Sequence, residues 1–128
     1  MTMTTTPHQM RALFCIGIRQ NFFDAAPDEA RDVWLAFGEM MNGIAAVPGV
    51  TVLGNIDDDQ SMVGESLSWP WTCYVLANVP NIEAVHAACN LFRTTVVGDG
   101  PFKLWKYAKV EARVGRELVV PPHLKKAD

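Results

Sequence analysis

Cysteine, excess positive charge and long apolar runs are all scarce in this sequence. Its three cysteines, Cys15, Cys73 and Cys89, form no Cys-x-x-Cys pair. They occupy segments that we expect to be buried, where a free thiol behaves as a small apolar side chain. Neither a zinc site nor a disulfide framework is predicted. With 11 basic and 14 acidic residues the net charge is −3, which offers no basic surface for nucleic acid.

No segment has the pattern of a targeting or membrane-spanning sequence. The Thr-rich N-terminus lacks a positive region followed by an apolar run, as a secretory signal would require. The longest apolar stretch, residues 12–18, is far shorter than the ~20 residues that cross a bilayer. We therefore expect a cytoplasmic protein with neither a membrane nor a nucleic-acid partner.

The composition is that of one folded domain. The chain has 128 residues, of which 49% are hydrophobic, and single domains cluster at ~100–150 residues. We expect residues 1–10 to be a flexible lead, 11–118 a single domain, and 119–128 an irregular tail.

Apolar patterns along the sequence predict four strands and two helices. The strands are expected at 11–20, 50–56, 71–79 and 103–114, and the helices at 27–47 and 82–95. A strand continuation over 61–68, with a bulge at Gly64, is one interpretation of an ambiguous segment. The order βαββαβ predicts a ferredoxin-like α+β fold, with an antiparallel four-stranded sheet and both helices on one face.

The first helix carries a broad apolar stripe, which we expect to be buried as a whole. Its members are Ala30, Val33, Trp34, Phe37, Met40, Met41 and Ile44.

The fourth strand separates two kinds of side chain by alternation. One face is expected to carry a small and apolar set that suits packing under helices: Lys106, Ala108, Val110, Ala112 and Val114. The opposite face is mixed and apolar enough to need a cover, which predicts a homodimer through a two-fold interface. That face is expected to carry Trp105, Tyr107, Lys109, Glu111 and Arg113, with Thr72, Tyr74, Leu76 and Asn78 from the third strand.

The element order from Arg11 to Glu117, with this mixed fourth strand, resembles the dimeric α/β-barrel superfamily of ferredoxin-like proteins. Its members include small monooxygenases, muconolactone isomerase-like proteins and stress-responsive proteins. More narrowly, WPWTCYVL (Trp69–Leu76) and LWKYAKVEARVGREL (Leu104–Leu118) are similar to bacterial IacB-type proteins of aromatic-compound catabolism. The resemblance implies a dimer, but a fold that hosts many chemistries does not transfer a reaction.

The mixed face also supplies most candidate site residues. Glu111 and Arg113 could fix a polar substrate, with Glu111 as a catalytic proton acceptor; a structural ion pair across the dimer interface is the alternative. Aromatic side chains could stack on a ligand or only pack in the interface. With Arg113, the expected substrate-binding residues are Trp71, Tyr74, Trp105 and Tyr107.

His86 is the only histidine inside a predicted helix or strand. It lies beside the buried stripe of the second helix and could act as a catalytic base in the cleft below; a hydrogen-bonded boundary histidine is the alternative. In haem-degrading members of the superfamily a histidine is the axial ligand, with an asparagine on the first strand. Here the first asparagine is Asn21, at that strand's end, so no cofactor is predicted and haem is kept as an alternative.

The triplet Asp57-Asp58-Asp59 lacks the glycine and distal glutamate of a calcium loop. We interpret it as a solvated hairpin turn, although Asp57, at a strand end, could point into a pocket.

Two functions remain open at this point. The first is a cofactor-independent enzyme of the oxygenase or isomerase type that acts on a small aromatic compound. The second is a non-catalytic, ligand-binding or stress-responsive dimer. His86 and the charged face of the fourth strand cannot both line one pocket unless a bulge reverses the alternation, and periodicity does not choose between them.

Overall fold

The computed structural model describes residues 10–65 and 68–124. The predicted lead at 1–10 therefore lies almost wholly outside the described residues, as do the last four positions of the predicted tail. The elements in chain order are β1 (Met10–Ile18), α1 (Gln20–Phe23), α2 (Pro27–Ala46), β2 (Thr51–Asp57), β3 (Cys73–Asn78), α3 (Ile82–Thr94), the 3₁₀ turn η1 (Leu104–Lys106), β4 (Ala108–Arg116) and the 3₁₀ turn η2 (Pro122–Leu124).

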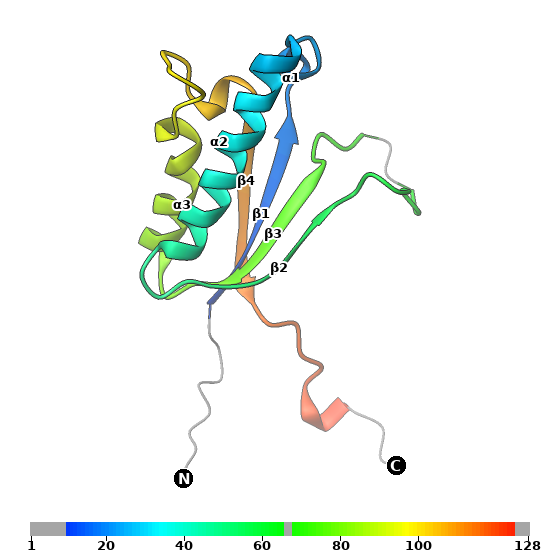
Figure 1. Cartoon of the computed structure of the whole chain (residues 1–128). Helices are drawn as coiled ribbons and strands as arrows, with labels where there is room; N and C mark the ends of the chain where they lie inside the picture. The colour runs from blue at the N-terminus through cyan, green and yellow to red at the C-terminus, as the bar shows by residue number, and fades with distance from the viewer. Residues whose placement is uncertain (1–9, 66–67, 125–128) are drawn as a thin grey trace.

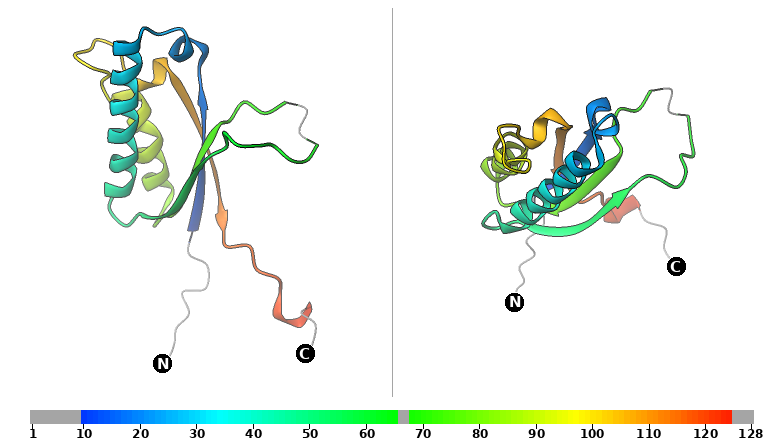
Figure 2. Two further views of the ribbon diagram at one scale, coloured as in Figure 1. Left: turned by 45° about the vertical axis from the view of Figure 1, so that its right-hand side comes forward. Right: turned by 45° about the horizontal axis from the view of Figure 1, so that its top comes forward.

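The predicted βαββαβ arrangement is confirmed. The four strands form one antiparallel sheet in the order β2-β3-β1-β4. The long helices α2 and α3 lie together on one side of this sheet, as the turned views of Figure 2 show. Figure 1 shows the described residues between β2 and β3, 58–65 and 68–72, projecting away from the helices.

Local signals explain where the two helices begin. Pro27 occupies the first turn of α2, where its missing N–H costs no hydrogen bond, and Asp28 and Glu29 follow in the same turn, favourably placed for the helix dipole. In α3, the side chain of Asn81 accepts a hydrogen bond from the backbone N–H of Ala84 at 2.9 Å, which satisfies one of the free donors at the helix start.

The core lies between the helices and the covered face of the sheet. On α2 the fully buried residues are Val33, Ala36, Met40 and Ile44. They meet side chains that alternate along the strands: Ala12, Phe14 and Ile16 from β1, Val75 and Ala77 from β3, and Ala108 from β4.

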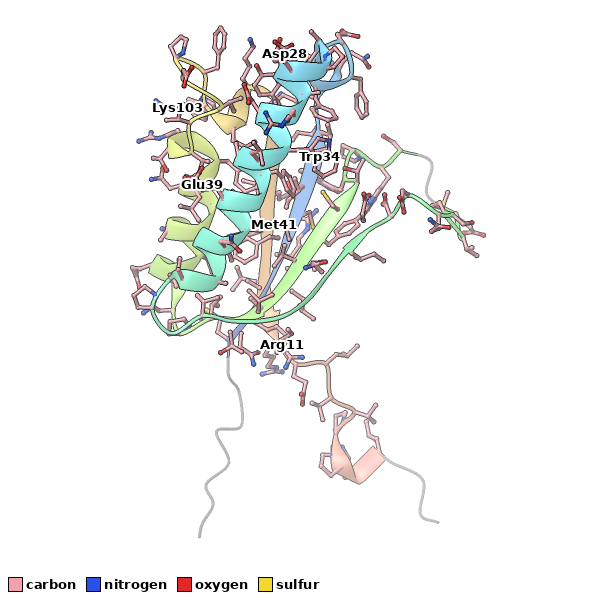
Figure 3. All side chains as sticks on the ribbon, viewed as in Figure 1. Arg11, Asp28, Trp34, Glu39, Met41 and Lys103 are labelled. Atoms are coloured by element: carbon pink, nitrogen blue, oxygen red, sulfur yellow. The ribbon has the colours of Figure 1, made fainter. Side chains whose placement is uncertain are left out.

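The broad buried stripe predicted for the first helix is wrong in its width. Trp34 is 61% exposed, and Phe37 and Met41 are only partly buried. Figure 3 shows Trp34 and Met41 on the sheet-facing side of α2, away from Glu39. An α-helix against a sheet buries a limited arc of its surface, so Phe37 and Met41 pack at the edge of the core and Trp34 lies largely outside it.

The predicted fourth strand begins five residues too early. Leu104–Lys106 forms a 3₁₀ turn, with the Tyr107 N–H donating to the carbonyl of Leu104 at 2.9 Å. A 3₁₀ turn repeats every three residues, so the two-residue alternation does not extend back to Trp105 and Tyr107. The prediction that both lie on the mixed sheet face is therefore wrong: Tyr107 is buried on the helix side, and Trp105 is exposed beside α3.

From Ala108 onward the predicted alternation is confirmed. Lys109, Glu111 and Arg113 pair with Gly17, Cys15 and Leu13 of β1, on the sheet face opposite the core. Tyr74 and Leu76 of β3 share this face. Among the described residues no helix lies over it, and we call it the uncovered sheet face (Figure 2).

Candidate functional site

A largely apolar cavity of about 530 Å³ opens between α1, α2 and the β2–β3 side of the sheet. Ligand sites for small molecules typically measure ~300–1,000 Å³ and combine apolar walls with a few polar groups. We call this cavity the main pocket. Its lining includes Ile16, Ile18, Phe22, Phe23, Val33, Trp34, Phe37, Met41, Asn55, Ile56, Asp57, Asp58, Asp59, Thr72, Cys73, Tyr74, Val75 and Tyr107.

The aromatic wall of the main pocket comes from α1 and α2. The rings of Phe22 and Trp34 meet edge to face at 6.1 Å, and Trp34 meets Phe37 at 6.4 Å, within the range of favourable aromatic pairs. Each ring limits the movement of the next. The wall is therefore a connected aromatic surface, although Trp34 itself is largely exposed.

A β-bulge in β2 determines which side chains form the polar wall of the main pocket, opposite the aromatic wall. Val52 pairs with Ala77, but the next pair is Gly54 with Leu76, so Leu53 is an extra residue. One extra residue shifts the in–out alternation of a strand. Ile56 consequently pairs with Tyr74 on the uncovered face.

Beyond this bulge the polar residues of β2 are on the helix side. Asn55 pairs with buried Val75, and Asp57 pairs with Cys73, so both side chains share the face that carries the core and the pocket. The interpretation of Gly64 as the bulge is wrong: Gly64 lies outside any strand, and the register shift is at Leu53.

The thiol of Cys73 lies on the same wall. Burial raises its pKa, a contact with the Thr72 hydroxyl lowers it, and the carboxylates of Asp57 and Asp58 raise it again. The net direction is upward, which disfavours the thiolate that a nucleophile would need. Cys73 is therefore a neutral wall group at physiological pH.

Tyr107 closes the floor of the main pocket. Its side chain is 1% exposed, and its hydroxyl donates a hydrogen bond to Glu29 Oε2 at 2.7 Å. Burial, and then this carboxylate acceptor, raise the pKa of Tyr107 to about 12. Because its one proton is committed to Glu29, Tyr107 has no proton free for a ligand.

Where the pocket meets the β2–β3 segment, Tyr74 joins two loop residues. Its hydroxyl donates to Asp58 Oδ2 at 3.0 Å and accepts from the Trp69 indole N–H. Burial raises the pKa of Tyr74, the Trp69 contact lowers it, and Asp58 raises it again, so this hydroxyl is also protonated at neutral pH. The hydrogen bond from Tyr74 holds the Asp58 side chain at the end of the sheet.

The structure brings only some of the predicted site residues to the main pocket. Tyr74 and Tyr107 line it, and so does Asp57. Glu111 and Arg113 lie on the uncovered sheet face, where Arg113 Nη2 contacts Glu111 Oε2 at 2.5 Å. The two side chains therefore form an ion pair on the surface of β4.

The remaining predicted residues lie elsewhere. Trp71, at the entry to β3, has the Lys109 ammonium 5.3 Å from its ring centre. His86 and Trp105 line a shallow, more open groove of about 470 Å³ between α3 and β4, with Arg19, Cys89 and Arg93. We call it the second groove. His86 and Glu111, the two predicted catalytic residues, are therefore not neighbours in one pocket.

Sequence reasoning missed the main aromatic wall and Asn55. The sequence predicts Trp34 and Phe37 as core residues, and Phe22 and Phe23 fall between the predicted strand at 11–20 and the predicted helix at 27–47. The usable signal was the width of the apolar stripe on α2, which exceeds what packing against the sheet requires. Asn55 gave no signal, because its direction depends on the bulge.

No protein-family model matches the chain, and a search of the curated proteins finds no similar sequence. None of the helices over 10–65 and 68–124 is long and apolar enough to cross a membrane. Within those same ranges, no three histidine, cysteine, aspartate or glutamate side chains gather as a metal site would require. The molecule is established as a ferredoxin-like α+β fold, and its function has to be inferred from the main pocket.

Proposed function

We propose that the protein binds a small aromatic compound in the main pocket. The observation that carries the proposal is the cavity of about 530 Å³ walled by the linked rings of Phe22, Trp34 and Phe37. An exposed tryptophan that holds its place through neighbouring rings offers a flat apolar surface, on which an aromatic ring gains both burial and stacking.

We further propose that the bound compound undergoes proton transfer without a cofactor. Asp57 is a carboxylate on the helix side of β2, across from an apolar wall, and a positioned carboxylate is an effective general base. Removal of a proton from the ligand is a step with which either an isomerisation or an oxygenation of an aromatic compound can begin. His86 and Glu111 do not line the pocket and have no part in this step.

Non-catalytic binding is the second candidate. It is favoured by the lack of a histidine in the pocket lining of the described residues, because Asp57 then has no imidazole beside it with which to exchange a proton. One measurement distinguishes the two candidate functions. It is the exchange of hydrogen between the bound compound and solvent D₂O, followed by NMR. Enzyme-dependent exchange that is lost in Asp57→Asn supports catalysis, and its absence from a tightly bound compound supports binding alone.

Binding is tested by replacing each of two exposed tryptophans by alanine. Trp34 lines the main pocket, whereas Trp105 lines the second groove and is similarly exposed, at 53% against 61%. Calorimetric titration with 2-naphthol should show affinity reduced at least tenfold in Trp34→Ala, because buried aromatic contacts dominate binding energy. Affinity should be unchanged in Trp105→Ala. If 2-naphthol and related bicyclic compounds neither bind nor raise the melting temperature of the wild type, the proposal fails.

We also propose that two copies pair through the uncovered sheet face, as in the dimeric α/β-barrel superfamily that the sequence resembles. Leu13 and Leu76 face each other at its centre, beside the Glu111–Arg113 pair. A face with apolar residues and both charge signs can complement itself across a two-fold axis. Light scattering at micromolar concentration should give the dimer mass for the wild type and the monomer mass for Leu76→Asp. A monomeric wild type contradicts this proposal.

A further inference from the structure

The polar wall of the main pocket carries negative charge and hydrogen-bond acceptors but no cation. Asp57, Asp58 and Asp59 line the pocket, and Asn55 adds an amide. No lysine, arginine or histidine occurs in the described lining. The lining of the second groove, by contrast, includes the cations Arg19, Arg93 and Lys109.

Of the three carboxylates, Asp57 is the one that belongs to β2, on the strand face that carries the pocket. Asp58 is occupied by the hydroxyl of Tyr74, whereas within the described residues no side chain is hydrogen-bonded or ion-paired to Asp57. Asn55 and Asp57 share one strand face because they are two residues, and therefore about 7 Å, apart. The bulge at Leu53 turns this face toward the helices. Together they face the aromatic wall of α2.

This arrangement determines how a ring on the aromatic wall would be recognised. A carboxylate beside low-dielectric walls repels a second carboxylate and accepts a strong hydrogen bond from an N–H or O–H group. The hydroxyls of Tyr107 and Tyr74 do not change this balance, since both already donate to carboxylates of the protein.

We infer that the main pocket selects neutral or cationic aromatic compounds that carry a hydrogen-bond donor, and rejects aromatic carboxylates, with Asp57 as the specificity-determining residue. The inference rests on the proposed function, because it assigns a ligand class to the same pocket. It adds that the charge on Asp57, presented by the β2 bulge, determines which aromatic compounds enter.

The test uses four compounds with the same bicyclic ring. 2-Naphthol has a donor, 2-methoxynaphthalene lacks it, 2-naphthoate is anionic and 2-naphthylmethylamine is cationic at neutral pH. A hydrogen bond to a charged group is worth about one tenfold step or more in affinity. Titration of the wild type should therefore show 2-naphthol binding about tenfold more tightly than 2-methoxynaphthalene, the amine at least as tightly as 2-naphthol, and 2-naphthoate most weakly.

Two isosteric variants complete the test. Asp57→Asn removes the charge at an exposed position, and Asp99→Asn makes the same change in the exposed turn after α3, outside the main pocket. Preference for 2-naphthol over 2-naphthoate should fall at least fivefold in Asp57→Asn and stay unchanged in Asp99→Asn.

The outcomes separate the two proposals. If none of the four compounds binds, the proposed function fails and the ligand class fails with it. If they bind with equal affinity, or if Asp57→Asn keeps the wild-type preference, the ligand class is refuted while aromatic binding stands.

Discussion

Replacing Tyr107 by phenylalanine removes one buried hydroxyl and leaves the ring in place. The hydroxyl donates to Glu29 Oε2 at 2.7 Å, and Tyr107 is 1% exposed. A hydrogen bond to a charged acceptor contributes about 1.5–3 kcal/mol. Because Glu29 is only partly buried and water can replace the lost donor, we expect Tyr107→Phe to lower the free energy of unfolding by about 1–2 kcal/mol at pH 7. For a domain of this size the melting temperature should fall by roughly 4–8 °C.

The pH dependence of this difference is more specific than its size. The pKa of Tyr107 rises from 10 to about 12 in the folded protein, and that difference corresponds to roughly 2–3 kcal/mol. The unfolded chain loses the proton first, so the stabilisation is complete below pH 10 and is lost as the pH rises toward 12. The stability advantage of the wild type over Tyr107→Phe should therefore be constant up to about pH 9 and shrink between pH 10 and 12.

Two assays check this prediction. Urea unfolding at a series of pH values gives the stability difference, in which the lysines and Tyr74 cancel because both proteins contain them. The absorbance change at 295 nm, wild type minus variant, gives the titration of Tyr107 alone. Equal stability at pH 7, a difference that does not vary from pH 8 to 12, or a difference titration centred near pH 10 would refute the reasoning. Glu29→Gln, which keeps a neutral acceptor, should lose less stability than Tyr107→Phe.

Three further changes test other parts of the structure. A methyl group at Gly17 would lie 2.5 Å from the carbonyl oxygen of Pro70, whereas one at Gly115 meets nothing within 4 Å. Gly17→Ala should therefore lower the free energy of unfolding by about 1–3 kcal/mol, seen as a lower midpoint in urea unfolding. Gly115→Ala should leave that midpoint unchanged; equal midpoints for the two variants contradict the packing at Gly17. Asn81→Ala removes the cap of α3 and should cost about 1 kcal/mol, seen as a lower melting temperature by circular dichroism. His86 lies in the second groove, so His86→Ala should leave the affinity for 2-naphthol unchanged. A tenfold loss of affinity would show that the compound binds in that groove instead.

The element order is predictable from the sequence because it depends on local periodicity. Apolar residues recur every three to four positions in α2 and α3 and every second position in most of β4, as 3.6-residue and two-residue repeats require. β1 and β3 are instead short, nearly continuous apolar runs, which is also typical of strands. The start of α2 follows from Pro27 and its two acidic neighbours. For these segments the local preference and the final fold agree.

The errors occur where that local repeat is interrupted. At Leu104–Lys106 a 3₁₀ turn replaces the strand, and it buries Tyr107 beneath α2 rather than on the sheet face. Residues 103–107 are compatible with a strand by composition. The turn is stabilised by contacts with distant segments, including the Leu104 N–H with the carbonyl of Thr95 and the Tyr107 hydroxyl with Glu29.

The sequence by itself determined the βαββαβ order and the charged face of β4 from Lys109 to Arg113, because both follow from residue patterns within single segments of the chain. Only the tertiary structure decided the candidate site. A bulge at Leu53 exists relative to the partner strand β3, so no pattern within β2 shows that Asn55 and Asp57 turn toward the helices. The cavity likewise depends on how α2 lies over the sheet, which leaves Trp34 at its rim instead of in the core.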